Sequence, residues 1–220
     1  MVCPMPSTGA GSSTKSTRSW TSDTLLLRLV DWGFGLSAIG WAIRIVFAHG
    51  STIVGATLAA LNLAVGVLLL VRRTPERLGA FSDSLLCLGS LVLSGVVLKL
   101  APPPEAWTLG PSMLFAAGGA GALVSLASLG TSFGVLPALR GLVARGPYRF
   151  IRHPAYACET LLVVACALAE PRVPWPWIAA LLAVGLLVVR VQLEERLLRL
   201  DPAYLSYQTQ VPWRLVPGVW

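Results

Sequence analysis

Six apolar stretches, separated by short polar segments, dominate the chain. They cover residues 29–48, 53–71, 84–100, 111–129, 155–169 and 177–200. About 20 apolar residues in a helix span the hydrocarbon core of a bilayer, and the stretch 155–169 is short by that measure. The pattern predicts an all-α, polytopic transmembrane helix bundle. In it, the fifth stretch either crosses the membrane or forms part of a re-entrant hairpin.

The composition favours a membrane protein over a soluble domain. Hydrophobic residues make up 55% of the 220 residues and charged residues only 12%, about half the charged fraction of soluble domains. The net charge of +7 predicts no nucleic-acid partner, because the basic residues gather in short loops, as membrane topology requires. The four cysteines have no paired spacing, so the sequence predicts neither a disulfide framework nor a metal site.

The basic residues also predict an orientation. If the six stretches alternate across the membrane, most arginines and lysines fall on one side, and Arg44, Lys99 and Arg172 fall towards the other. The side richer in arginine and lysine is the cytoplasm. We therefore expect a multi-pass protein with both termini in the cytoplasm. Residues 1–22, rich in Ser, Thr and Gly, are predicted to be a disordered cytoplasmic tail.

Small residues recur in the fourth stretch at spacings that bring them to one helical face. Such a face permits close helix packing in a membrane. The residues are Ala117, Gly118, Gly121, Ala122 and Ser125.

A polar segment at residues 142–156 interrupts the apolar pattern. Gly146-Pro147 predicts a turn. Pro154 suits the first turn of the next helix and disfavours helical geometry at His153. His153 should then lie at the helix mouth, where backbone N–H groups favour an anionic group. The alternative is a topology signal with interfacial tyrosines, which does not require the His-Pro pair.

Charges within membrane spans are functional candidates, and three such residues stand out, whereas Asp31 and Arg44 in the first stretch are expected to be anchors near the interface. Glu159 is one turn into the fifth stretch, and Arg190 and Glu194 are four residues apart in the sixth. The alternative for the last two is a helical ion pair. Further on, Tyr204 and Tyr207 are spaced to share one helical face, either on a flap over a site or on a simple interfacial helix.

Three motifs together resemble the isoprenylcysteine carboxyl methyltransferase family. This family lies within a wider group of integral-membrane methyltransferases that includes the phospholipid N-methyltransferases. The resemblance covers residues 131–220, while residues 23–130 would be the N-terminal transmembrane helices. The motifs are Leu142-Val143-x-x-Gly146-x-Tyr148-x-x-x-Arg152-His153-Pro154-x-Tyr156, Arg190-x-x-x-Glu194-Glu195 and Tyr204-x-x-Tyr207-x-x-x-Val211-Pro212.

The resemblance implies a site for S-adenosylmethionine and a lipophilic acceptor. Arg190 corresponds to the catalytic arginine that binds the acceptor, most simply a carboxylate of the isoprenylcysteine type. Cys158 stands where the family usually has glycine, which predicts a tighter cofactor pocket, and Arg140 replaces a histidine of eukaryotic relatives. The implied cofactor-binding residues are Leu142, Val143, Tyr148, His153, Pro154, Ala155, Tyr156 and Glu194.

Other functions stay open at this point. The acceptor could instead be a phospholipid head group or a small thiol. The scaffold also resembles the C-terminal part of sterol and enone reductases that use NADPH. A membrane protein without enzymatic activity is the third alternative.

Overall fold

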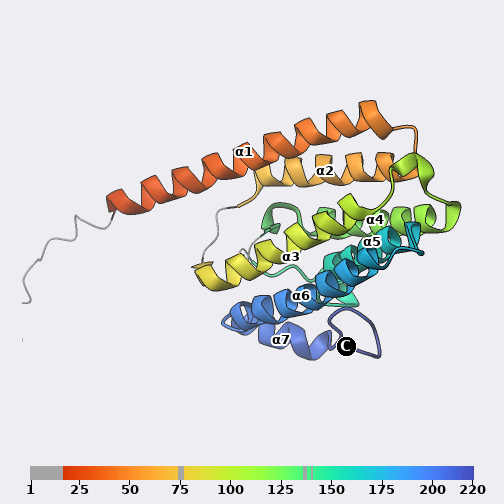
Figure 1. Cartoon of the computed structure of the whole chain (residues 1–220). Helices are drawn as coiled ribbons and strands as arrows, with labels where there is room; N and C mark the ends of the chain where they lie inside the picture. The colour runs from red at the N-terminus through yellow and green to blue at the C-terminus, as the bar shows by residue number, and fades with distance from the viewer. Residues whose placement is uncertain (1–16, 74–76, 136–137, 140) are drawn as a thin grey trace, which may run out of the picture.

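The computed structural model describes residues 17–73, 77–135, 138–139 and 141–220. Seven α-helices form the described fold, with short 3-10 turns and one two-residue strand pairing between them (Figure 1). The helices are α1 (Thr17–His49), α2 (Ile53–Val71), α3 (Phe81–Leu100), α4 (Leu109–Leu129), α5 (Pro154–Ala169), α6 (Pro174–Leu198) and α7 (Pro202–Gln210).

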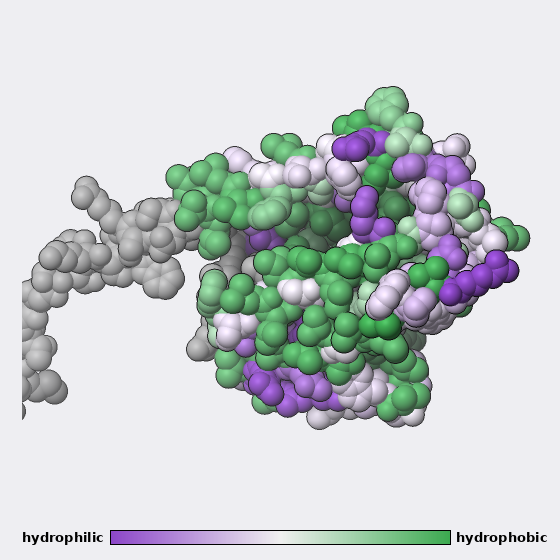
Figure 2. Space-filling view, in the orientation of Figure 1, coloured by the Kyte–Doolittle hydropathy of each residue, from purple (hydrophilic) through white to green (hydrophobic). Residues whose placement is uncertain are grey.

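The predicted helical membrane fold is confirmed. Five helices, namely α1 to α4 and α6, are long and apolar enough to cross a bilayer. Helix α5 has 16 residues, which gives a length of about 24 Å, and it packs against α6. The fifth stretch is thus the shorter arm of a helical hairpin. Broad apolar surface covers the helices in Figure 2, as a lipid-facing bundle requires.

Helix α1 begins earlier than the sequence predicted. Residues 17–22 belong to it, although we expected them in a disordered tail. Extending an existing helix fixes one residue per hydrogen bond gained, so propagation is far cheaper than nucleation. The rest of the predicted tail, residues 1–16, lies outside the described part of the chain.

The helices pack in pairs. Helix α1 lies along α2, α4 packs on α5, and α3 packs on α6, while contacts between α2 and α4 join the first pair to the others. In Figure 1, α1 and α2 form one edge of the molecule, and α7 lies beside the C-terminal part of α6. Tyr204 and Tyr207 of α7 are buried in a cluster with Val211 and Leu198, which fixes α7 to the end of α6.

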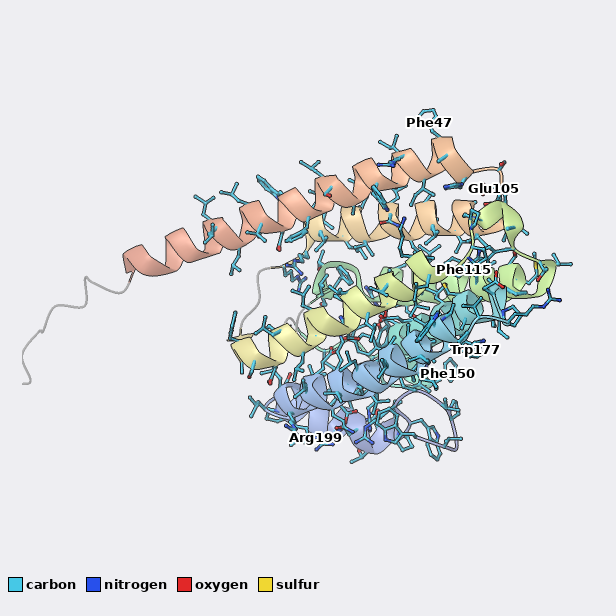
Figure 3. The ribbon with its side chains drawn as sticks, viewed as in Figure 1. Phe47, Glu105, Phe115, Phe150, Trp177 and Arg199 are labelled. Carbon is cyan, nitrogen blue, oxygen red and sulfur yellow. The ribbon has the colours of Figure 1, made fainter. Side chains whose placement is uncertain are left out.

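The connections that carry the basic residues meet at one end of the bundle. Strands β1 (Arg77–Leu78) and β2 (Ala138–Leu139) pair antiparallel, so the α2–α3 connection meets the segment after α4. The Arg73 N–H also donates to the Thr131 carbonyl over 2.8 Å. At the other end, His49 Nδ1 and Glu105 Oε1 lie 2.6 Å apart. Figure 3 shows Arg199 and Trp177 at opposite ends of α6.

The small-residue face of α4 brings α5 close, as predicted. A Cβ added at Gly118 would come within 3.1 Å of Leu161 Cβ, and one at Gly121 would come within 2.7 Å of Cys158 Sγ. Both approaches are shorter than ordinary van der Waals contact. The sulfur of Cys158 therefore occupies the space that the missing side chain of Gly121 leaves.

Adding a methyl group at this contact should loosen the bundle. We expect Gly121→Ala to lower the thermal unfolding midpoint in detergent, because overpacking costs about 1–3 kcal/mol. The Gly110→Ala variant in the same helix is the matched control, since nothing lies within 4 Å of its added Cβ. Combining Gly121→Ala with Cys158→Ala should restore the midpoint. Equal midpoints for the two single alanine variants would show that this contact does not limit stability.

The orientation stays a prediction of the arginine and lysine distribution. A reporter that fluoresces only in the cytoplasm should be bright when fused after Trp220, and dark when inserted after Arg172, at the turn between α5 and α6. The reverse pattern would place the clustered basic loops outside the cytoplasm.

Candidate active site

A cavity of about 430 Å³ lies at the end of the bundle where the basic connections meet. That volume is within the range of pockets for small molecules and cofactors. Its wall combines α4, α5, α6 and α7 with the segments 132–135 and 141–156. Of the predicted site residues, all but Pro154 line it: Leu142, Val143, Tyr148, His153, Ala155, Tyr156, Arg190 and Glu194.

The turn before α5 forms as the sequence predicted. Gly146 has φ +58°, a conformation that favours glycine, and Gly146–Arg149 form a 3-10 turn. Pro154 occupies the first turn of α5, and His153 is the residue just before it. These features aim His153 and Tyr156 into the cavity, where their rings stack with centroids 5.6 Å apart. Arg140 lies outside the described residues.

Backbone donors at this helix mouth are used by the chain itself. The N–H groups of Arg152 and His153 donate to the carbonyls of Trp213 and Arg214, each over 2.9 Å. We expected backbone N–H groups at the start of α5 to bind an anion. At His153, a carbonyl of the segment after α7 accepts that hydrogen bond instead. Main-chain hydrogen bonds thus hold the C-terminal segment against residues 142–153, the motif loop.

Arg190 and Glu194 do not form the helical ion pair that the sequence left open. The Tyr156 hydroxyl donates to Glu194 Oε2 over 2.5 Å, and Arg190 Nη2 donates to the Val135 carbonyl over 2.8 Å. The guanidinium also lies 4.7 Å from the centroid of the Tyr156 ring. Tyr156 therefore contacts both residues, Glu194 through its hydroxyl and Arg190 through its ring.

Glu159 supplies the counter-charge to Arg190. Its Oε2 lies 3.8 Å from Arg190 Nη1, and its Oε1 accepts a hydrogen bond from Ser94 Oγ over 2.9 Å. Arg190 is 5% exposed, and its Nη1 has no hydrogen-bond partner. A buried donor of this kind is costly unless something binds it.

Cys158 does not tighten the cavity, which corrects our expectation. It points at α4, where its sulfur meets Gly121, and it is absent from the cavity wall. Positions two residues apart on a helix project about 200° apart, so Cys158 faces away from Tyr156.

Sequence reasoning missed the most connected group of the site, Glu195. This carboxylate is 1% exposed, and side chains from four separate segments surround it. The partners are Arg152 Nε at 2.9 Å, His153 Nε2 at 3.3 Å, Arg199 Nη2 at 3.3 Å, Arg214 Nε at 3.0 Å and the Tyr204 hydroxyl at 3.3 Å. The signal was present as the second glutamate of the Glu-Glu pair, but its surroundings become visible only once the chain is folded.

Helix α7 covers the cavity, which supports the flap interpretation. Tyr204 and Tyr207 share one buried face and both line the cavity. The Tyr207 hydroxyl donates to the Tyr148 carbonyl over 2.5 Å, and burial raises the pKa of Tyr207 to about 12. Its hydroxyl therefore stays protonated at physiological pH and keeps donating to the motif loop.

Removing the charge of Glu195 should destabilise the protein. Glu195→Gln leaves buried Arg152 without its anion, and breaking a buried ion pair from one side costs about 3–5 kcal/mol. We expect a clear drop in the thermal unfolding midpoint in detergent. Glu170→Gln, at the far end of α5, is the matched control and should stay within about 0.5 kcal/mol of the wild type. If both variants unfold together with the wild type, the cluster is not a stabilising centre.

Comparison with known proteins finds similarity both in sequence and in fold. Residues 112–200 match the phospholipid methyltransferase family. A solved structure of the eukaryotic intramembrane Ras methyltransferase ICMT (isoprenylcysteine carboxyl methyltransferase) matches with a TM-score of 0.50 and 14% sequence identity. That match covers 92% of this chain and 95% of the other. No curated protein sequence matches the chain.

Both comparisons agree with the resemblance carried by the three motifs. The family match includes the motif loop, α5 and α6, and the structural match extends the likeness to the N-terminal helices, which carry no motif. The chain thus shares the fold of the solved isoprenylcysteine carboxyl methyltransferase, and its residues 112–200 resemble the phospholipid methyltransferase family.

Proposed function

We propose that the chain transfers a methyl group from S-adenosylmethionine to the carboxylate of a lipophilic acceptor of the isoprenylcysteine type, at the cytoplasmic membrane face. One observation carries the proposal. Arg190, a buried cation with an unpaired donor, and the carboxylate of Glu194 share one cavity with most of the predicted cofactor-binding residues.

The residues present fit the cofactor. Glu194 Oε2 accepts a hydrogen bond from the Tyr156 hydroxyl, and Oε1 would accept one from a ribose hydroxyl or an ammonium group of the cofactor. The stacked rings of His153 and Tyr156 offer a flat aromatic face, and Leu142 and Val143 supply an apolar wall. A cavity with few polar groups in an apolar wall is typical of cofactor sites. When bound, the cofactor supplies an activated methyl group as the electrophile.

The chain's own contribution is alignment and the exclusion of water. A carboxylate acceptor is already ionised at neutral pH, so the site needs no strong base. Arg190 is suited to hold it, because a planar guanidinium matches a carboxylate in two contacts. Helix α7 closes the cavity with Tyr204 and Tyr207, and a closed, aligned site favours an in-line displacement.

The match to the phospholipid methyltransferase family favours a second candidate acceptor, the amine of a lipid head group. Such an amine arrives as an ammonium ion, which Glu159 and Glu194 would attract and Arg190 would repel. The two candidates therefore differ in whether Arg190 helps or hinders transfer.

Two conservative variants test the proposed roles. Glu194→Gln should weaken S-adenosylhomocysteine binding, measured by calorimetry. Arg190→Lys should leave that affinity near the wild-type value and slow single-turnover methyl transfer to a prenylcysteine, because an ammonium cannot reproduce the two-pronged contact. Each loss should be about 10- to 100-fold, as for a hydrogen bond to a charged group.

The controls separate the alternatives. Glu170→Gln and Arg172→Lys repeat the two changes at the opposite end of α5 and should behave as the wild type. Wild-type protein that binds NADPH and not S-adenosylhomocysteine would refute methyl transfer. Transfer to a lipid amine that improves in Arg190→Gln, which removes the repelling positive charge, would establish the second candidate.

A further inference from the structure

The carboxylate of Glu159 lies beside the guanidinium of Arg190, where it would repel an anionic acceptor. The positive charge of Arg190 is balanced by Glu159, with 3.8 Å between Nη1 and Oε2. That distance is too long for a hydrogen bond, and Nη1 has no other partner. An acceptor carboxylate at Nη1 would then lie beside the carboxylate of Glu159, and like charges so close repel strongly in a low-dielectric site.

Ser94 holds Glu159 at this distance. The hydroxyl, from α3, donates to Oε1 over 2.9 Å and pulls the carboxylate towards α3 and away from Arg190. The side chain of Glu159 is 20% exposed, compared with 5% for Arg190. Glu159 therefore has room to move, while Arg190 is fixed by Val135 and by the ring of Tyr156.

Glu159 also stands where two cavities meet. It lines the main cavity and a second, apolar one of about 190 Å³ between α2, α3, α4 and α5. Ser94 lines only the second cavity, and Arg190 only the main one. A rotation of the Glu159 side chain would thus move its carboxylate away from Arg190 and towards Ser94 and the second cavity.

We propose that Glu159 is a displaceable counter-ion of Arg190 and that it determines how tightly the site binds an acidic acceptor. This inference rests on the proposed function and names the residue that tunes its acceptor step. Bound acceptor carboxylate replaces Glu159 as the partner of Arg190, and Ser94 keeps the displaced carboxylate hydrogen-bonded. Glu159 is thereby a specificity-determining residue: it penalises anionic acceptors and leaves neutral ones unaffected.

Two variants should change acceptor affinity in opposite directions. Glu159→Gln removes the competing charge, so the KM for N-acetyl-S-farnesylcysteine should fall by about tenfold. Ser94→Ala releases Glu159 to close on Arg190, so that KM should rise severalfold. Inhibition by the matching carboxamide, which is neutral, should be the same in both variants and in the wild type. Affinity for S-adenosylhomocysteine, from calorimetry, serves as the folding control, and Glu170→Gln as the matched charge control.

The outcomes separate this inference from the proposed function. Absent S-adenosylhomocysteine binding by the wild type would contradict the proposed function itself. In Glu159→Gln, an unchanged or raised KM, or a loss of transfer with normal S-adenosylhomocysteine binding, would overturn only the counter-ion role. If Glu159→Gln does not bind S-adenosylhomocysteine, the sign of the KM change in Ser94→Ala decides, and a lowered KM refutes the proposal.

Discussion

The buried carboxylate of Glu195 is the interaction on which the site depends. It joins α6, the motif loop, α7 and the C-terminal segment through arginine, histidine and tyrosine side chains. A carboxylate this deeply buried is tolerable only when several donors surround it. Arg152 and Arg214 depend on Glu195 in turn, because their buried or half-buried positive charges need an anion as a partner. One charge thereby sets the position of the loop at Arg152 and His153 relative to the three segments at the C-terminal end of the chain.

Two neighbouring glutamates serve separate purposes because of helix geometry. Successive residues on a helix project about 100° apart, so Glu194 faces the cavity and Tyr156, whereas Glu195 faces α7 and the motif loop. Glu194 lines the cavity, where we propose that it binds the cofactor, and Glu195 joins the segments that surround the cavity. Two adjacent acidic residues of the sequence thus have entirely different surroundings.

Much of the fold followed from the sequence, and the site did so in part. The hydrophobic stretches predicted the helices, because the length and hydropathy of a stretch can be read from adjacent residues alone. The Gly146-Pro147 turn and the start of α5 at Pro154 also came from local geometry. The partners of Arg190 did not, because Glu159, Val135 and Tyr156 reach it from other elements. The orientation of Cys158 required knowing which face of α5 packs on α4.

The main-chain bonds between the motif loop and residues 213–214 have a consequence for biosynthesis. Ribosomes deliver the chain from its N-terminus, so the membrane helices and the motif loop are made before the segment that closes them. Until that segment arrives, the N–H groups of Arg152 and His153 lack their carbonyl partners and Glu195 lacks Arg214. The cavity can therefore reach its described form only after residues 213–214 have been made.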